Sequence, residues 1–270
     1  MTEPTDRLAV AVAQFAPTDD TAANLEAVGA LAADAASLGA RLVVFPEYSS
    51  YFAPQFDEDV LRHAEPVDGP FTRQLGRLAS SLGIHLVAGM LESTGGRRVS
   101  NTVVAVDPSG ALVATYRKLH LYDAFGHRES DWVQPGAIEP PETFRVGDFT
   151  VGLQTCYDLR FPELTRRLVD AGANLVAVPS EWVRGPLKEH HWRTLVTARA
   201  LENTIYVVAA DHAPPIGAGN SMIVDPMGVE LVTIGETTDV AVARASSARL
   251  AQVREINPAL ALRRFGVSER

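Results

Sequence analysis

Residues 149–179 read FTVGLQTCYDLRFPELTRRLVDAGANLVAVP, and this stretch decides the predicted fold. Two short apolar runs, FTVGLQT (149–155) and NLVAVP (174–179), predict buried strands. Between them, FPELTRRLVDAGA (161–173) has a proline and an acidic residue in its first turn and a glycine near its end, which predicts a helix. The stretch is therefore a β-α-β unit.

The same order occurs near the N-terminus, where LAVAVAQF (8–15), NLEAVGALAADAASLGA (24–40) and RLVVFP (41–46) predict a strand, a helix and a strand. GARLVVFP (39–46) and GANLVAVP (172–179) also share five of eight letters. Two interpretations stay open. Either the chain consists of two related halves whose sheets pack together, or any buried strand that follows a helix end has this composition.

The rest of the chain continues the alternation of strands and helices. Strands are predicted at 85–91, 101–107, 111–118, 205–211 and 221–226, and helices at 69–82 and 188–203. Nearly continuous apolar strands that alternate with helices predict an α/β layered fold with the helices outside. We expect one domain over residues 1–270, with a C-terminal tail of about residues 245–270 that packs on the domain or on a partner subunit.

Composition narrows the class of function. The chain has 24 basic and 33 acidic residues and a net charge of −9, which argues against nucleic-acid and membrane-surface binding because both need a positive surface. The N-terminal MTEPTDRLAV lacks a basic segment before its short apolar run, so no signal peptide is predicted. With a single cysteine and no possible internal disulfide, we expect a cytoplasmic protein.

Polar residues that chemistry can use follow several predicted strands. Glu47 follows RLVVFP, Lys118 follows ALVATYR, Cys156 follows FTVGLQT, and Ser180-Glu181-Trp182 follow NLVAVP. Functional side chains of layered α/β folds gather at such strand ends. A thiolate is a strong nucleophile, a carboxylate can take its proton, and an ammonium can stabilise an oxyanion. Each residue also has an ordinary interpretation: a buried core cysteine, a solvated loop acid and a surface lysine.

Three separated blocks favour a catalytic role for Glu47, Lys118 and Cys156. They are FPEYSS (45–50), YRKLHLYD (116–123) and CYDLRFPEL (156–164). In this order and at these separations they resemble the catalytic blocks of the nitrilase superfamily, the carbon–nitrogen hydrolases. The resemblance implies an α-β-β-α sandwich, in which two sheets pack face to face between helical layers. It also implies Glu47 as general base, Lys118 as catalytic lysine and Cys156 as nucleophile.

The resemblance extends to a second acid and to the reaction. RESDWVQPG (128–136) places Glu129 where the family has a further glutamate, which would orient Lys118 or the substrate amide. The implied reaction is hydrolysis of a small linear carboxamide through a thioester on Cys156, with the oxyanion held by Lys118 and the Tyr157 N–H. It needs no metal and no organic cofactor.

CYDLRFPEL most resembles the amidases that act on ω-amides of dicarboxylic acids and on deaminated glutathione. Such substrates carry a carboxylate, and Arg160 is the candidate to bind it, unless Arg160 pairs with Asp158 or Glu163. In SEWVRGP (180–186), Trp182 is a candidate apolar wall, Arg184 a second anion partner, and Ser180 a further substrate contact. Family members commonly exchange C-terminal segments, so a homodimer or larger homo-oligomer is expected.

Other functions stay open. A metal hydrolase would use His190, His191 and His212 with Glu181 or Glu189, although adjacent histidines on a helix point about 100° apart. A Cys–His protease would use His120. The same Glu-Lys-Cys site could also transfer an acyl group or hydrolyse a nitrile or an N-carbamoyl group, and a non-catalytic scaffold of the same fold is a further alternative.

Overall fold

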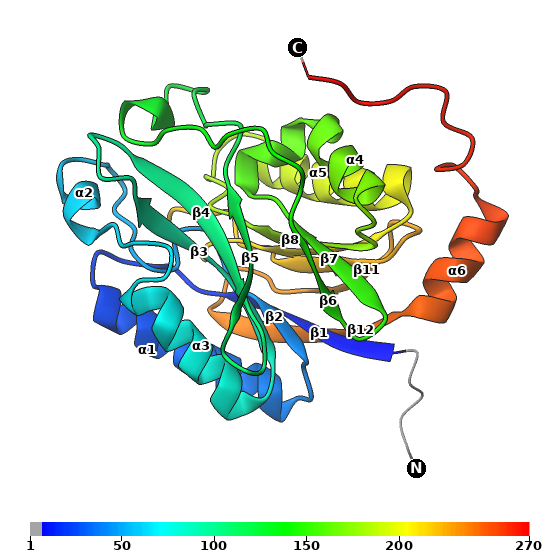
Figure 1. Cartoon of the computed structure of the whole chain (residues 1–270), viewed down its shortest axis with the longest axis horizontal. Helices are drawn as coiled ribbons and strands as arrows, with labels where there is room; N and C mark the ends of the chain where they lie inside the picture. Colours follow the sequence, from blue (N-terminus) through cyan, green and yellow to red (C-terminus); the bar gives the residue numbers. More distant parts are fainter. Residues whose placement is uncertain (1–6, 270) are drawn as a thin grey trace.

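The computed structural model describes residues 7–269, which form two six-stranded mixed sheets packed face to face with helices outside (Figure 1). Residues 1–6 and 270, which the expected domain includes, lie outside the described residues. This arrangement is the four-layer α-β-β-α sandwich that was expected. No helix among the described residues is long and apolar enough to cross a membrane.

The first sheet has the strand order β12-β1-β2-β3-β4-β5. Its strands are β1 (Arg7–Gln14), β2 (Leu42–Val44), β3 (His85–Ser93), β4 (Val99–Val106), β5 (Leu112–Arg117) and β12 (Asp239–Ser246). β1, β2 and β3 are parallel, and the remaining neighbours are antiparallel.

The second sheet repeats this pattern with the order β6-β7-β8-β9-β10-β11. Its strands are β6 (Thr143–Val146), β7 (Phe149–Leu153), β8 (Leu175–Pro179), β9 (Tyr206–Ala210), β10 (Met222–Val224) and β11 (Glu230–Thr233). Here β7, β8 and β9 are parallel and the other neighbours antiparallel. β2 and β8, which contain the two similar sequence stretches, therefore occupy equivalent central places, as the interpretation of two related halves requires.

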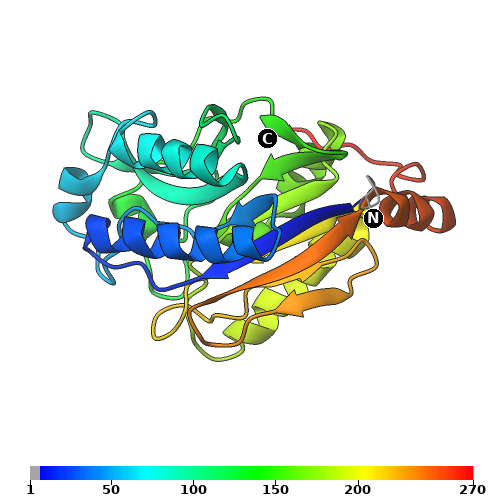
Figure 2. The ribbon, with the colours of Figure 1, turned by 90° about the horizontal axis from the view of Figure 1, so that it is seen from below.

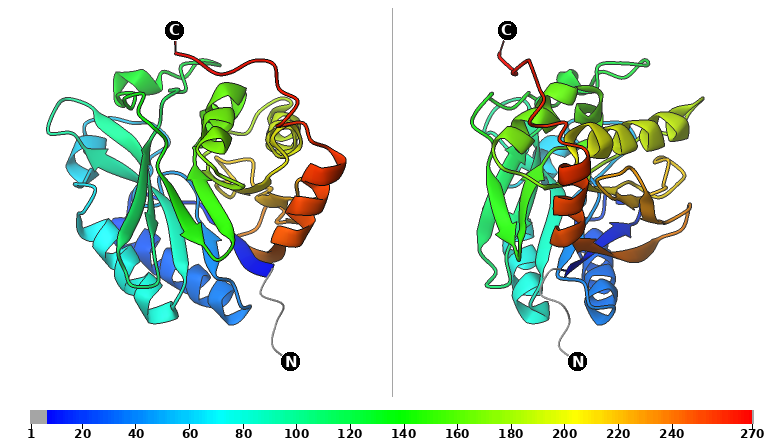
Figure 3. Two further views of the ribbon diagram at one scale, coloured as in Figure 1. Left: turned by 45° about the vertical axis from the view of Figure 1, so that its right-hand side comes forward. Right: turned by 90° about the vertical axis from the view of Figure 1, so that its right-hand side faces the viewer.

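Apolar side chains between and outside the sheets hold the layers together. Val and Leu side chains of both sheets, such as Val12, Val44, Val151 and Val208, form the buried core between them. α1 (Thr21–Ser37) and α3 (Pro70–Leu82) cover the outer face of the first sheet, and α4 (Pro162–Asp170) and α5 (Lys188–Asn203) cover that of the second (Figure 3, left). The short α2 (Asp59–His63) lies in the loop between β2 and α3.

The element bounds differ from the sequence predictions in ways that matter at the site. β5 ends at Arg117 and β7 at Leu153, so Lys118 lies just beyond its strand and Cys156 lies three residues beyond the end of β7. β6, β11 and β12 were not predicted. β12 pairs with β1 over eight residues (Figure 2). Its side chains are mostly half-buried, so it lacks the continuous apolar run that signals a buried strand.

The expected C-terminal tail of about residues 245–270 contains regular structure at its start. Residues 245–246 belong to β12 and residues 247–256 form α6 (Ser247–Ile256), so the irregular segment begins at residue 257. That segment runs from α6 back along the side of the molecule (Figures 1 and 3). There the Arg263 guanidinium donates to Asp170 of α4 at 2.6 Å, while Phe265 is 92% exposed. The homo-oligomer stays a prediction.

Candidate active site

The turn after β2 places Glu47 inside the molecule, with its side chain only 1% exposed. The next residue, Tyr48, has φ +55°, a left-handed conformation that non-glycine residues rarely adopt. The turn also passes so close to β3 that a Cβ on Gly89 would lie 2.6 Å from the Glu47 Cα. Glycine at that position therefore allows the Glu47 backbone to approach the sheet.

Three donors hold the Glu47 carboxylate. Its Oε1 accepts from Asn101 Nδ2 at 2.5 Å and from Lys118 Nζ at 2.9 Å, and its Oε2 accepts from the Glu181 N–H at 2.6 Å. The Glu47 carbonyl accepts from His212 Nε2 at 2.7 Å. Because the donors come from both sheets, Glu47 has one fixed orientation between them.

Lys118 bridges two carboxylates. Its ammonium, 2% exposed, lies 2.9 Å from Glu47 Oε1 and 2.9 Å from Glu129 Oε2. Glu129, in the short 3₁₀ helix η1 (Glu129–Asp131), also accepts from Tyr48 Oη at 2.5 Å and from the Tyr122 N–H at 2.6 Å. The buried cluster thus holds one lysine and two acids.

The electrostatics separate these two acids. Burial raises the pKa of Glu47 by more than the Lys118 ammonium lowers it. Burial also acts to raise the pKa of Glu129, but Lys118, the Tyr48 hydroxyl and the Tyr122 N–H together bring it below its usual range. For Lys118, burial acts to lower the pKa, and the charges of Glu129 and Glu47 overcome it and hold that pKa well above its ordinary value. These directions favour a charged Glu129 beside Lys118 and a Glu47 that takes up a proton more readily than Glu129.

Cys156 is the first residue of the 3₁₀ helix η2 (Cys156–Arg160), which follows β7 after a sharp turn. Its φ is +45°, a strained conformation of the kind that concentrates at functional sites. The Thr155 and Asp158 side chains cap the turn reciprocally with backbone N–H groups. The Cys156 Sγ lies 3.2 Å from the Glu181 carbonyl, so the backbone of one residue contacts both the thiol and the Glu47 carboxylate.

The surroundings of the Cys156 thiol favour its protonated form. Burial, and next the charge of Glu47, raise its pKa well above its ordinary value, and the Lys118 ammonium only partly opposes them. A buried thiol with a raised pKa needs a neighbouring base before it can attack.

Asp158 ties the Cys156 turn to the strand that leads to Lys118. Its buried carboxylate accepts from Tyr116 Oη at 2.7 Å, from the Thr155 N–H at 3.2 Å and lies 2.7 Å from His120 Nδ1. The hydrogen bond between Tyr116 and Asp158 joins β5 of the first sheet to η2, which follows β7 of the second sheet. From its sequence, Asp158 was expected only as an alternative partner of Arg160. Its buried network depends on contacts between distant segments that no local pattern reveals.

A cavity of about 530 Å³ brings the predicted catalytic residues together. Glu47, Lys118, Glu129 and Cys156 all line it, with Glu181 beside them and Tyr48, Phe52 and Trp132 among its walls. A void of about 10 Å³ adjoins it and is lined by Cys156, Tyr157, Arg160, Trp182 and Lys188. Tyr122, Cys156, Glu181 and Val183 line both spaces.

Two residues predicted to contact substrate lie elsewhere. Ser180 is fully buried and lines neither space, and its hydroxyl donates to the Val178 carbonyl at 3.4 Å. Arg184 pairs with Glu189 and Glu236 and lines neither space. Both are therefore left out of the candidate site. Their positions depend on the end of strand β8 and on the conformation of the loop after it, and a sequence motif does not predict that conformation.

Arg160 does not pair with Asp158 or Glu163, the alternative that its sequence left open. Among the ion pairs of residues 7–269, none involves Arg160. Its guanidinium lies over the aromatic rings of Phe125, Tyr157 and Trp182, with centroid distances of 5.4, 5.8 and 4.9 Å. The cation is thus held beside Cys156 without a carboxylate.

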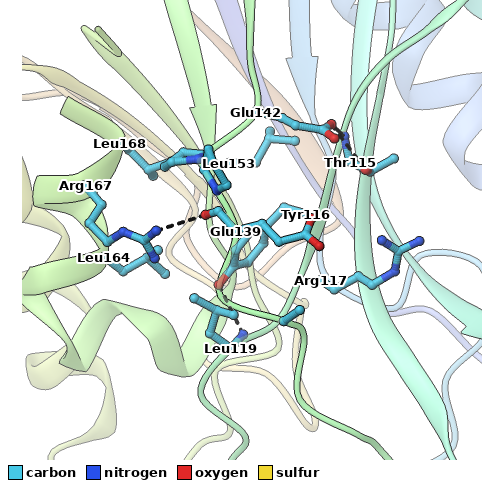
Figure 4. A pocket seen from close by; sticks show the side chains of 13 residues that line it. Thr115, Tyr116, Arg117, Leu119, Glu139, Glu142, Leu153, Leu164, Arg167 and Leu168 are labelled. Carbon is cyan, nitrogen blue, oxygen red and sulfur yellow. Dashed lines mark hydrogen bonds between the residues drawn. The ribbon is translucent and has the colours of Figure 1, made fainter. Parts of the chain in front are cut away.

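A further cavity, of about 120 Å³, lies between β5 and α4 (Figure 4). Leu153, Leu164 and Leu168 form one side of it and Tyr116 another, while Arg167 donates to the Glu139 carbonyl at its edge. None of the predicted site residues lines it, so the larger cavity at Cys156 is the candidate active site.

The histidines that a metal hydrolase would use as ligands have other surroundings in the structure. His212 is buried, and burial lowers its pKa to about 4, so its neutral ring donates to the Glu47 carbonyl. His190 and His191 lie on α5. Within the described range, no three His, Cys, Asp or Glu side chains gather where they could hold a metal ion.

Comparison with known proteins identifies the family to which the chain belongs. A model of the carbon–nitrogen hydrolase family matches residues 9–255. The chain is 41% identical over 263 residues to a deaminated glutathione amidase from Escherichia coli O157:H7, covering 95% of this chain and 97% of that protein. It is 39% identical over 262 residues to a hydrolase from Mycobacterium tuberculosis, covering 91% and 92%. The crystal structure of the C. elegans NitFhit protein matches with a TM-score of 0.86 at 29% identity, covering 98% of this chain and 69% of that one.

The chain therefore belongs to the carbon–nitrogen hydrolase family, the nitrilase superfamily, and resembles its amidase branch. It is a hydrolase that acts on carbon–nitrogen bonds other than peptide bonds.

Proposed function

We propose that this protein is an amidase that hydrolyses a small linear carboxamide to the carboxylic acid and ammonia through a thioester on Cys156. One observation carries the proposal: the hydrogen-bonded cluster of Glu47, Lys118 and Glu129 lines the same cavity as the Cys156 thiol. A base, a fixed cation and a nucleophile in one space are the groups that acyl transfer from nitrogen to sulfur requires.

In the first step Glu47 takes the thiol proton and Sγ bonds to the amide carbon. The carbonyl oxygen becomes an oxyanion, which the Lys118 ammonium and the N–H of Tyr157, in the first turn of η2, stabilise. Glu47 then returns the proton to the nitrogen, the carbon–nitrogen bond breaks, and ammonia leaves. The product is a thioester between Cys156 and the acyl group.

In the second step a water molecule replaces ammonia. Glu47 takes a proton from this water, whose oxygen bonds to the thioester carbon, and the same two donors stabilise the second oxyanion. The carbon–sulfur bond breaks, the carboxylic acid leaves, and Glu47 returns the proton to Sγ. Glu129 does not exchange a proton in this scheme. It holds Lys118 charged and in place, in agreement with its lowered pKa.

The substrate we propose carries a carboxylate. Support comes from the relative named deaminated glutathione amidase and from the Arg160 cation, which lies beside Cys156 without a carboxylate partner. Trp182 and Tyr157 would contact the acyl chain as walls of the same void.

A substrate panel tests the proposal. The panel is α-ketoglutaramate, deaminated glutathione, asparagine, an N-carbamoyl amino acid and a simple nitrile, with ammonia assayed in each case. Release from a carboxamide supports the amidase, whereas release from only the nitrile or the carbamoyl compound would assign a different reaction to the same residues. No release from any of them, in the presence or absence of an added amine acceptor, would support a non-catalytic role.

The acid limb of the activity profile should lie above pH 4.5, the ordinary value for a glutamic acid, because the pKa of Glu47 is raised. Only ionised Glu47 can take the thiol proton, so kcat/KM should be lost as the pH falls through that raised pKa. A pH profile of kcat/KM measures it. An acid limb at or below pH 4.5 would show that a different group acts as the base.

His120→Ala separates this mechanism from a Cys–His protease. The His120 ring is stacked on Phe161 at 3.7 Å and bonded to Asp158, so we expect kcat/KM to fall by less than about 10-fold. Loss of a general base would cost about 100- to 10,000-fold. Activity of the purified variant on the substrate found in the panel decides between the two.

A further inference from the structure

The two groups proposed to stabilise the oxyanion belong to different halves of the molecule. Lys118 follows β5 of the first sheet, whereas the Tyr157 N–H lies in η2, which follows β7 of the second sheet. A displacement of about 1 Å at a catalytic group can cost about 100-fold in rate. The separation of the Lys118 segment from η2 therefore has to be fixed.

The main chain of Lys118 is bonded to the first half of the molecule. Its N–H donates to the Asn101 carbonyl at 2.9 Å, and its carbonyl accepts from the Gly136 N–H at 2.8 Å. Neither contact reaches the second sheet. Glu47 provides one connection across, because it accepts from the Lys118 ammonium and from the Glu181 N–H. That connection acts on the end of the Lys118 side chain, and the main chain around Lys118 has a second one.

Asp158 provides this second connection. Its fully buried carboxylate accepts from the Tyr116 hydroxyl at 2.7 Å and from the His120 N–H at 3.2 Å, and it lies 2.7 Å from His120 Nδ1. The Tyr116 hydroxyl oxygen in turn accepts from the Leu119 N–H at 3.2 Å (Figure 4). The carboxylate is therefore bonded to the chain on both sides of Lys118.

The same carboxylate also holds the turn that carries the nucleophile. It accepts from the N–H of Thr155, the residue before Cys156, at 3.2 Å, and the Thr155 side chain accepts from the Asp158 N–H. Asp158 directly follows Tyr157, whose N–H would contact the oxyanion. One side chain thus joins the segment that carries Lys118 to the turn that carries both the sulfur and the second oxyanion donor.

Packing alone does not fix Tyr116, the residue through which Asp158 contacts β5. Part of its ring borders the cavity of about 120 Å³ between β5 and α4 rather than packed side chains (Figure 4). Burial first, and next the charge of Asp158, raise the pKa of Tyr116 well above its ordinary value, so the hydroxyl keeps its proton and donates it. The hydrogen bond to Asp158 therefore determines where the end of β5 lies relative to η2.

We propose that Asp158 is a positioning residue that sets the separation of the two oxyanion donors, the Lys118 ammonium and the Tyr157 N–H. Asp158 lines neither the cavity at Cys156 nor the adjoining void, so it acts through the segments it joins and not by contact with the substrate. This inference rests on the proposed amidase function and adds to it a residue outside the cavity on which the rate depends.

Asp158→Asn tests the proposal, because asparagine keeps the size of the side chain but has one acceptor atom in place of two and no charge. We expect kcat for the amide that the panel identifies to fall by about 10- to 100-fold and KM to change by less than about threefold. Tyr116→Phe removes a single hydrogen bond and should lower kcat by about 3- to 10-fold. Because both variants act through one contact, their combination should lower kcat no further than Asp158→Asn alone.

An aldehyde makes the test independent of turnover. With succinic semialdehyde, Sγ of Cys156 bonds to the aldehyde carbon, the thiol proton passes to Glu47, and the carbonyl oxygen becomes an oxyanion, but no leaving group can depart. We expect its Kd to rise in each variant by about the factor by which kcat falls, since both depend on the oxyanion donors. A residue needed only for folding would lower the amount of folded enzyme and leave this Kd unchanged.

The matched control is Asp225→Asn. Asp225 is a second buried aspartate that caps a turn, where it accepts from the Met227 and Val229 N–H groups at 2.7 and 3.0 Å. It follows β10 beside the start of β9, at the end of the second sheet opposite to the Cys156 turn. Its substitution should lower the thermal unfolding midpoint but change neither kcat nor the aldehyde Kd.

The outcomes separate this inference from the proposed function. Ammonia release with a kcat and an aldehyde Kd that Asp158→Asn leaves unchanged would overturn the role of Asp158 and leave the amidase intact. If Asp158→Asn does not fold, Tyr116→Phe decides in the same way. An aldehyde Kd that depends on Asp158, without ammonia release from any amide, would support the positioning role and contradict the amidase. Neither ammonia release nor an aldehyde adduct in the native protein would contradict both.

Discussion

Cys156→Ala is expected to lower the rate of ammonia release by at least about 10,000-fold, because the thioester can form only on this sulfur. The effect should be on kcat rather than on folding. Alanine is smaller than cysteine by one sulfur atom and occupies the same backbone turn, so the cavity and the Glu47 cluster should persist. Steady-state ammonia release, with enzyme at high concentration to reach the residual rate, measures the loss.

Two controls accompany this variant. Its thermal unfolding midpoint should stay close to that of the native protein, and it should still bind the substrate that the panel identifies, since neither property needs the sulfur. Turnover by Cys156→Ala at a rate within about 100-fold of the native enzyme would mean that another residue, or water directly, attacks the amide.

Lys118→Met is expected to produce the second-largest effect, and it should act on both rate and stability. The variant lacks one oxyanion donor, which lowers kcat by about 100- to 1,000-fold. It also leaves Glu47 and Glu129 buried without their shared cation, and breaking such a buried pair costs about 3–5 kcal/mol of unfolding free energy. Denaturant unfolding at several pH values measures the second effect.

The loss of unfolding free energy in Lys118→Met should depend on pH in one direction. In the native protein Lys118 holds the pKa of Glu129 below its ordinary value, so the pair contributes stability above the unfolded-state pKa of a glutamic acid, and this stability is lost as the pH falls through the lowered folded value. The destabilisation by Lys118→Met should therefore be largest at neutral pH and shrink in acid.

A triple variant separates the two effects. Lys118→Met combined with Glu47→Gln and Glu129→Gln removes all three charges, so it should recover much of the unfolding free energy without recovering turnover. If Lys118→Met alone retained native stability at neutral pH, the cluster would not hold the two carboxylates as described. If it retained native kcat, Lys118 would not contact the oxyanion.

The positions of the main candidates were predictable because they depend on strand ends. Glu47, Lys118 and Cys156 each follow an apolar run, and such runs identify strands even when their bounds are off by a residue or two. The similarity between the sequence stretches around β2 and β8 could also be recognised, because both are apolar runs. Parallel strands buried on both faces have a narrow composition, and here they occupy equivalent places in the two sheets.

The partners of these residues could not be predicted, because they depend on contacts between distant segments. Asn101 and Tyr48 were ordinary letters in a strand and in a motif, yet they donate to Glu47 and Glu129 respectively. Lys188 opens a predicted helix, where a lysine is normally solvated. In the folded chain, the loop that carries Tyr122 and Phe125 helps to bury it, and this loop is distant in the sequence.

The central claim, that a thioester forms on Cys156, is tested most directly by intact-mass spectrometry of the enzyme quenched in acid during turnover. We predict a covalent adduct with the mass of the acyl group, located on the peptide that contains Cys156 and absent from Cys156→Ala. Hydroxylamine should remove the adduct, as expected of a thioester. Steady ammonia release without any such adduct under single-turnover conditions, or an adduct on a residue other than Cys156, would contradict the account.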